Sequence, residues 1–187
     1  MSVKLLKPRR FADERGWFAE TYHAARYAKL GVDAVFCQDN QALSRQVGVL
    51  RGMHFQAPPH AQAKLVRCTR GRIWDVAVDI RAGSPTYGRW TGAELDPENG
   101  LQVFVPVGFA HGYLTLEPDT EVEYKVTDFY APDCEGGLIW NDPEVAITWP
   151  LAEPAMILSD KDRQLPSLAA FVSPFAYDGT PLSPLQP

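Results

Sequence analysis

The sequence predicts an all-β protein, an antiparallel sandwich or barrel with short peripheral helices. Apolar and polar residues alternate with period two in several short segments, most clearly over residues 74–80 and 121–126. Clusters of turn-forming residues, such as GSPTYG at 83–88 and DPENG at 96–100, separate these segments. Many short strands at this spacing are typical of antiparallel sheets, so we expect few helices outside the sheets.

The first 47 residues combine strands with one helix. A short strand is expected over residues 3–7, a turn over 13–16 and an aromatic strand over 17–22. Residues 23–30 (HAARYAKL) are rich in alanine and end before Gly31, so they predict a short helix, with Thr21 as its cap. A strand with a polar end follows over residues 36–44.

Length and composition indicate one globular domain in a reducing compartment. The chain has 187 residues, 45% of them hydrophobic, with no apolar run of membrane-spanning length and no signal peptide in MSVKLLKPRR. Its three cysteines show no paired spacing, which favours buried free thiols and a cytoplasmic location. A net charge of -5 argues against a nucleic-acid partner.

We expect the domain (1–187) to have three parts: N-terminal strands and helix over 1–47, a core over 48–149 and a C-terminal segment over 150–187. The alternation weakens past Trp149. After Ser167 the tail is expected to wrap the surface or a neighbour, because prolines interrupt it at positions 174, 181, 184 and 187.

Two segments carry the chemistry, Gly48–Gly71 (GVLRGMHFQAPPHAQAKLVRCTRG) and Gly100–His111 (GLQVFVPVGFAH). Their spacing resembles the two cupin signatures, which implies a cupin-type jelly roll. In a metal cupin the ligands are His-x-His, a glutamate and the second-motif histidine. Here Gln56 and Lys64 stand where the second histidine and the glutamate would be. An ammonium has no lone pair and repels a cation, so we expect no metal and a cavity suited to an anion.

Strand alternation predicts which side chains share this cavity. His54 and Gln56 lie on one face of their strand, together with Leu50 and Gly52. Tyr124 alternates with charged neighbours and points toward the core. These three side chains can therefore face one lumen. Arg51 falls on the opposite face unless Gly52 marks a β-bulge, which alternation leaves open.

Nine blocks occur in order along the chain: DERGWFAETY, QDNQ, GVLRGMHFQ, KLVRC, DVAVDIRAGSPTYG, PVGFAHGY, YKVTDFY, IWNDPEVAITWP and LSDKD. The set resembles the dTDP-4-dehydrorhamnose 3,5-epimerase family over about residues 3–166. The resemblance implies a metal-free cupin, a homodimer with exchanged N-terminal strands and a dTDP-linked 4-keto-6-deoxyhexose as substrate. It implies no cofactor, because the keto group that the chemistry needs is already on the sugar.

Epimerisation next to a ketone needs a base on one face of the sugar, an acid on the other and a cation for the enolate oxygen. The resemblance implies His54 as the base, Tyr124 as the acid and Lys64 as the enolate partner. It implies that Asp162, in LSDKD, orients and charges the histidine. Singly, each of these residues would more often be structural: a satisfied histidine, a packing tyrosine, a solvated lysine and a capping aspartate.

The resemblance also implies a set of substrate-binding residues. Arginines suit the diphosphate because the guanidinium group can bind it with two hydrogen bonds. One aromatic residue stacks on the base, and the partner chain offers further residues to it. Each of these residues could instead have a structural role, as a surface charge or in core packing. For His111 the alternative is a plain hydrogen bond. The residues are Arg15, Phe18, Glu20, Gln38, Asn40, Arg51, Gln56, His111, Tyr130 and Trp140.

Three functions follow from these residues. The first is epimerisation at both C3 and C5, as in dTDP-L-rhamnose synthesis. The second is a single-position 3- or 5-epimerase of a deoxysugar pathway, which would share the same acid–base pair. The third is a cupin that binds a sugar nucleotide without turning it over. Gln56 and Lys64 argue against a metal-dependent oxygenase.

Overall fold

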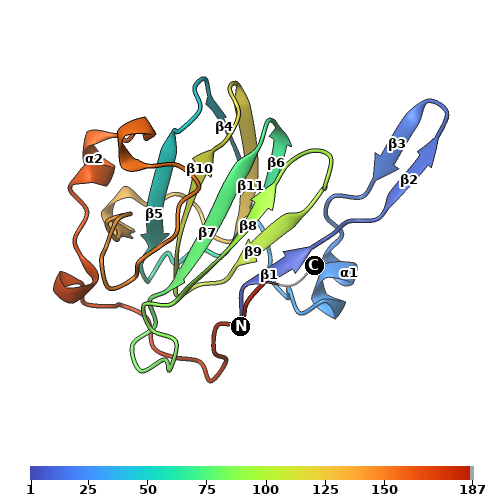
Figure 1. The fold of residues 1–187 in the computed structure, drawn as a ribbon. Coiled ribbons are helices and arrows are strands. Elements are labelled where there is room, and N and C mark those ends of the chain that lie inside the picture. Colours follow the sequence, from blue (N-terminus) through green and yellow to red (C-terminus); the bar gives the residue numbers. More distant parts are fainter. Residues whose placement is uncertain (186–187) are drawn as a thin grey trace.

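Two five-stranded antiparallel sheets face each other in the computed structural model, which describes residues 1–185 (Figure 1). The first contains, in spatial order, β1 (Lys4–Leu6), β9 (Gln102–Val105), β6 (Lys64–Arg70), β11 (Thr120–Val126) and β4 (Gln38–Ser44). The second contains β12 (Glu135–Gly137), β5 (Leu50–Gln56), β10 (Phe109–Thr115), β7 (Ile73–Asp79) and β8 (Trp90–Leu95). Apart from β7 and β8, neighbours in each sheet are not consecutive in the chain, and the arrangement confirms the predicted all-β jelly roll.

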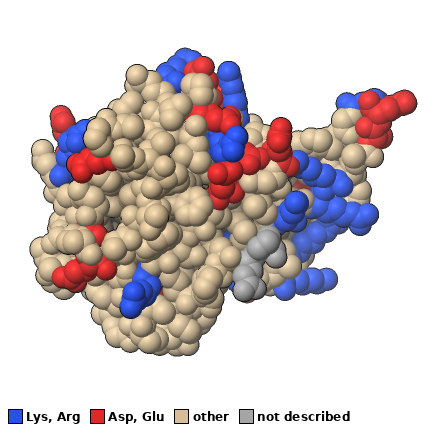
Figure 2. Space-filling model, in the orientation of Figure 1, with Lys and Arg blue, Asp and Glu red and all other residues tan. Residues whose placement is uncertain are grey.

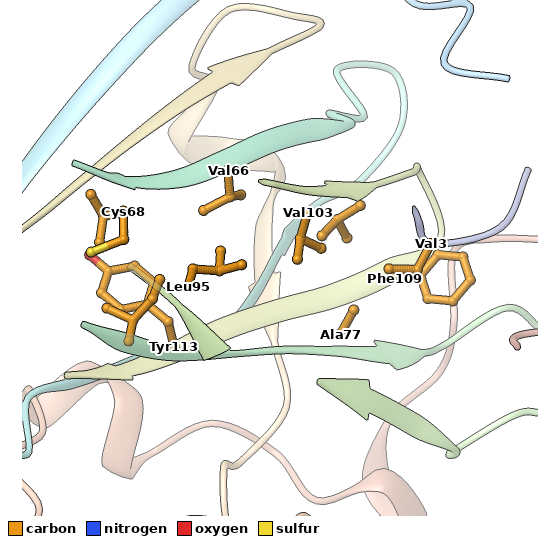
Figure 3. Packing of buried hydrophobic residues seen from close by; sticks show 11 residues of the cluster. Val3, Val66, Cys68, Ala77, Leu95, Val103, Phe109 and Tyr113 are labelled. Atoms are coloured by element: carbon orange, nitrogen blue, oxygen red, sulfur yellow. The ribbon is translucent and has the colours of Figure 1, made fainter. Parts of the chain in front are cut away.

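An apolar core fills the space between the sheets. Val66 and Val103 of the first sheet face Ala77 and Leu95 of the second (Figure 3). These four side chains are at most 1% exposed. Burial of a Val or Leu side chain contributes about 1.5–3 kcal/mol. The facing apolar sides of the two sheets therefore hold the sandwich closed.

Strand β7 is buried on both faces. Val76 and Val78 pack beneath the C-terminal half of the chain, whereas Ala77 faces the opposite sheet. Asp75 and Asp79 lie on the same face as Ala77 and are completely buried. The polar half of this period-two pattern is therefore turned inward, which requires partners for both carboxylates.

The N-terminal region projects from the sandwich as a hairpin of β2 (Arg10–Asp13) and β3 (Gly16–Ala19) (Figure 1). Helix α1 (Ala24–Lys29) follows and ends before Gly31, as predicted. The prediction of Thr21 as the cap is wrong: the N-cap is His23, and its side chain makes no capping hydrogen bond. Clustering of Tyr27 with apolar residues of the first sheet anchors the helix instead.

The chain after β11 consists of short helical turns, extended segments and the short strand β12. These turns are η1 (Pro132–Cys134), η2 (Glu153–Ala155), α2 (Asp160–Arg163) and η3 (Leu168–Ala170). The tail wraps its own body, because Phe175 is buried, Ala176 bridges to Ala82, and Asp178 pairs with buried Arg81 at 2.8 Å. Pro187 lies outside the described residues. No helix in residues 1–185 has the length and apolar character needed to span a bilayer.

The three cysteines differ in exposure. All are free, but only Cys68 is buried, while Cys134 is half-buried and Cys37 is exposed. Burial raises the pKa of the Cys68 thiol to about 12. The expectation of three buried thiols therefore holds for Cys68 alone.

Candidate active site

A cavity of about 520 Å³ opens between the two sheets. Strands of both sheets and the segment around α2 contribute to its wall. All four residues predicted to be catalytic line it. Its wall includes His54, Lys64, His111, Tyr113, Tyr124 and Asp162.

A bulge in β5 aims both Arg51 and His54 at this cavity. Arg51 lies opposite Tyr113 and His54 opposite His111, so β5 takes three steps where β10 takes two. Gly52 makes the bulge possible: its φ is +146°, and a Cβ there would lie 2.5 Å from a backbone atom of the neighbouring strand. The bulge brings Arg51 into the cavity wall. The expectation that Leu50, Gly52 and His54 share one face by strict alternation, with Arg51 on the other, therefore does not hold.

His54 and Asp162 form a tight pair. Nε2 of His54 lies 2.6 Å from Oδ1 of Asp162, which is a buried residue of α2. Burial by itself raises the pKa of Asp162, but hydrogen bonds with His54, Ser159 and the backbone of Gly52 outweigh it and lower the pKa below its usual value. The charged carboxylate accepts the Nε2 proton. Nδ1 is then the basic atom of the ring, and Asp162 stabilises the imidazolium that forms when Nδ1 takes a proton.

Lys64 supplies a cation beside this pair. Its Nζ donates to the backbone oxygen of His54 at 3.4 Å. Burial lowers the pKa of Lys64 to about 8, although the charges of Asp75 and Glu135 oppose the shift. Near neutral pH the side chain is therefore a cation with little solvent around it. Such a group can stabilise an oxyanion strongly.

Tyr124 enters the same cavity from the opposite sheet. Its strand pairs it with Asn40 on one side and Val66 on the other, and its ring packs against the core between the sheets. Burial raises the pKa of Tyr124, and the Arg51 charge offsets part of that shift. The phenol is therefore neutral over the physiological range and can donate a proton.

His111 and Asp75 form a second pair in the wall. Nε2 of His111 lies 2.8 Å from Oδ2 of Asp75, and both residues are buried. Sequence reasoning did not identify Asp75. Its position within the apolar strand DVAVD was the available signal, because a carboxylate there needs a partner. The second pair fixes the orientation of His111 directly across the strand ladder from His54.

Several predicted binding residues gather at the edge of the cavity. Alternation along β4 places Gln38 and Asn40 on the face of Ala42, which lines the cavity, and Gln38 donates to Oδ1 of Asn40 at 2.8 Å. Gln38 also accepts from the backbone NH of Tyr130 at 3.3 Å. Tyr130 itself is 57% exposed, so its ring is free to stack on a ligand.

The side chain of Gln56 is occupied by the backbone. Its Oε1 accepts from the NH of Ala131 at 2.9 Å, and its Nε2 donates to the carbonyl of Phe129 at 3.0 Å. These bonds hold the loop that carries Tyr130. Trp140 lies in an apolar cluster with Leu50, Leu114 and Met156 and is 5% exposed. The structure therefore places Trp140 in the core, the alternative that its sequence context left open.

Three predicted binding residues are on the projecting hairpin or its base and do not line the cavity. Arg15 pairs with Asp13 at the tip, Phe18 is 66% exposed, and Glu20 pairs with Arg26. Figure 2 shows acidic and basic side chains at the hairpin tip, separated from the main body. None of the three contributes to the wall of the cavity in its own chain.

An ion pair that sequence reasoning missed borders the cavity. Lys161, which lines the wall, pairs with Glu135 at 2.5 Å. Lys161 directly precedes Asp162 in the LSDKD segment, and this position was the available signal that Lys161 lies at the site. Within residues 1–185 no group of three or more His, Cys, Asp or Glu side chains is arranged to hold a metal ion.

Comparisons with known proteins agree with this geometry. The family model described as dTDP-4-dehydrorhamnose 3,5-epimerase matches residues 1–170. The dTDP-4-dehydrorhamnose 3,5-epimerase of Sinorhizobium fredii is 51% identical over 94% of this chain and 89% of its own length. A crystal structure of the Bacillus anthracis dTDP-4-dehydrorhamnose 3,5-epimerase with TDP and PPi bound is 49% identical, with a TM-score of 0.85 over 88% of this chain and 93% of that one. The Legionella pneumophila dTDP-6-deoxy-D-glucose-3,5-epimerase, in complex with dTDP-4-keto-L-rhamnose, is 44% identical, with a TM-score of 0.86 over 91% of this chain and 89% of that one.

Proposed function

The chain belongs to the dTDP-4-dehydrorhamnose 3,5-epimerase family, and from this premise we propose that it is an isomerase of a dTDP-4-keto-6-deoxyhexose. It inverts C3 and C5 through an enolate, as in dTDP-L-rhamnose synthesis. The observation that carries the proposal is the single cavity in which the His54–Asp162 pair, Lys64 and Tyr124 meet. In this proposal the chain forms one domain, works in the cytoplasm and needs no cofactor.

The residues divide the reaction between them. Nδ1 of His54 takes the proton from the carbon next to the ketone, and the electron pair of that C–H bond moves onto the ketone oxygen. Lys64 stabilises the resulting enolate. Tyr124 then gives its proton to the same carbon from the opposite face, which inverts it. Exchange with water returns His54 and Tyr124 to their starting protonation states, so no electron acceptor is needed.

We also propose that two chains exchange their N-terminal hairpins as a homodimer. The hairpin exposes Phe11, Trp17 and Phe18, which are 47%, 56% and 66% accessible, and large apolar side chains gathered in this way mark interaction surfaces. Exchange would carry Arg15, Phe18 and Glu20 to the cavity of the partner, where the diphosphate and base of the nucleotide lie.

Deuterium incorporation tests the proposed function. The protein is incubated with dTDP-4-keto-6-deoxyglucose in heavy water, and C3 and C5 are followed by NMR. We expect deuterium at both carbons, because one base and one acid serve both inversions. Incorporation at one carbon would identify a single-position epimerase. Binding of dTDP without incorporation would contradict catalysis and identify a sugar-nucleotide-binding cupin.

The pKa of Lys64 predicts the alkaline limit of activity. The ammonium form, which stabilises the enolate, is present below a pKa of about 8 and is lost above it. The value of kcat/KM, which reports on the free enzyme, should therefore fall as pH rises through about 8. Lys64→Met should lower kcat about 100- to 1,000-fold and remove this limb of the profile. A profile of Lys64→Met that keeps the same alkaline limb would assign it to another group.

A further inference from the structure

The projecting hairpin is attached to the body at one small area. Its second strand leads to Thr21, whose carbonyl oxygen lies 2.8 Å from the Tyr27 hydroxyl and accepts from Nε2 of Gln102 at 3.0 Å. Gln102 is 3% exposed and begins β9, so this end is held by a buried amide. The first strand leaves the body beside the turn over residues 96–100.

Arg10 connects the first strand to that turn. Its guanidinium donates to the carbonyl of Glu98 at 2.7 Å and to the carbonyl of Pro97. The same group lies over the Trp17 ring of the second strand, 4.2 Å from the ring centroid. A single planar side chain thus contacts both strands of the hairpin and the body. Gly100 leaves room for it, because a Cβ there would lie 2.5 Å from the guanidinium.

The turn that receives Arg10 is held together by its own side-chain hydrogen bonds. Oδ1 of Asp96 accepts from the backbone NH groups of Glu98 and Asn99 at 2.7 Å each. The side chain of Asn99 donates to Oδ2 of Asp96 at 2.9 Å and to the carbonyl of Glu94 at 3.0 Å. These bonds cross-link the turn whose two carbonyl groups Arg10 binds.

We propose that Arg10 is a positioning residue that sets the direction of the hairpin and thereby the place where Arg15, Phe18 and Glu20 meet the nucleotide. This rests on the proposed exchange of hairpins between partners. An isolated two-stranded hairpin is marginally stable in water, so its direction depends on its base. Four residues at about 3.3 Å each make a strand about 13 Å long, and a tilt of about 10° at the base displaces the tip by about 2 Å. A displacement of about 2 Å is enough to break a hydrogen bond to the nucleotide, because N–H···O distances lie within about 2.7–3.2 Å.

Arg10→Met tests the proposal, because methionine keeps an apolar stem and removes every donor. Arg9→Met is the matched control: Arg9 is the adjacent arginine and also lies over a hairpin aromatic, Phe11, at 4.6 Å, but it makes no hydrogen bond to the body among the described residues. In the intact protein, the Kd for dTDP and the KM for substrate should rise about tenfold in Arg10→Met, the size of one lost hydrogen bond, with kcat within about twofold, since binding geometry rather than chemistry is changed. Arg9→Met should match the unaltered chain.

Arg10→Lys should give an intermediate Kd, because an ammonium keeps the charge but lacks the planar fork. Light scattering should show every variant as a dimer. A dimeric Arg10→Met with unchanged Kd, an equal weakening in Arg9→Met, or a monomeric Arg10→Met would each overturn the positioning role. An inactive unaltered chain would instead contradict the proposed isomerase function, and a monomeric unaltered chain would contradict the proposed exchange of hairpins, so the failures are distinguishable.

Discussion

Replacing His54 with asparagine should abolish both deuterium incorporation and epimer formation. Nδ1 of His54 is the basic atom of the pair with Asp162, and an amide cannot accept a proton at neutral pH. Removal of a general base lowers the rate about 100- to 10,000-fold. We therefore expect the rates at C3 and at C5 to fall at least about 1,000-fold. NMR of the substrate in heavy water measures both carbons in one experiment.

Binding separates loss of chemistry from loss of the site. The dTDP group should bind His54→Asn almost as well as the unaltered chain, because the proposed contacts of the nucleotide lie elsewhere. His60→Asn is the matched control: His60 is an exposed histidine that also faces a carboxylate, Asp128 at 3.2 Å. It should retain full activity. Incorporation that persists in His54→Asn would mean that another group, with His111 the first to test, is the base.

Replacing Tyr124 with phenylalanine should separate proton removal from inversion. The ring shape is kept, whereas the neutral phenol that protonates the second face is lost. Epimer formation should fall about 100- to 10,000-fold. His54 can still take the substrate proton and return a deuteron to the same face, so deuterium should enter the substrate without a change of configuration. Chiral analysis of recovered substrate, together with its deuterium content, measures the two events independently.

Tyr113 provides the matched control for Tyr124. Both rings line the cavity, but the Tyr113 hydroxyl is buried without a partner among the described residues and points toward Cys68 (Figure 3). Tyr113→Phe should therefore leave inversion intact. A loss of inversion in Tyr113→Phe, with normal inversion in Tyr124→Phe, would transfer the role of acid to Tyr113.

Much of the fold could be predicted because it depends on local patterns. Period-two alternation and Gly/Pro turns determine where strands begin and end, and these patterns located β7 and β11 to within one or two residues. Helix α1 was found from its alanine content and from Gly31, but its cap was not, because Thr21 is held by Gln102, a contact between distant residues. Tertiary contacts of this kind leave no mark in the neighbouring sequence.

The site was predicted only in part, because local motifs reveal some of its residues and tertiary contacts determine the others. His54, Lys64, Tyr124 and Asp162 were named from motifs and line one cavity. Arg51 could not be placed, because a bulge adds one residue to the alternation. The close approach of Gly112 on the adjacent strand, which requires a glycine at position 52, becomes visible only in the structure. Asp75 and Glu135 were missed because each matters through a partner that is distant in sequence, His111 for one and Lys161 for the other.

The pairing of His54 with Asp162 joins positions that are 108 residues apart. The last strand of the two sheets ends at Gly137, so both sheets are translated before the carboxylate of Asp162 and the part of the cavity wall around α2. We therefore expect a product terminated before Ser159 to lack turnover, because the His54 imidazole would have no carboxylate partner. Catalytic competence thus reports that synthesis has passed Asp162, well beyond the last strand of either sheet.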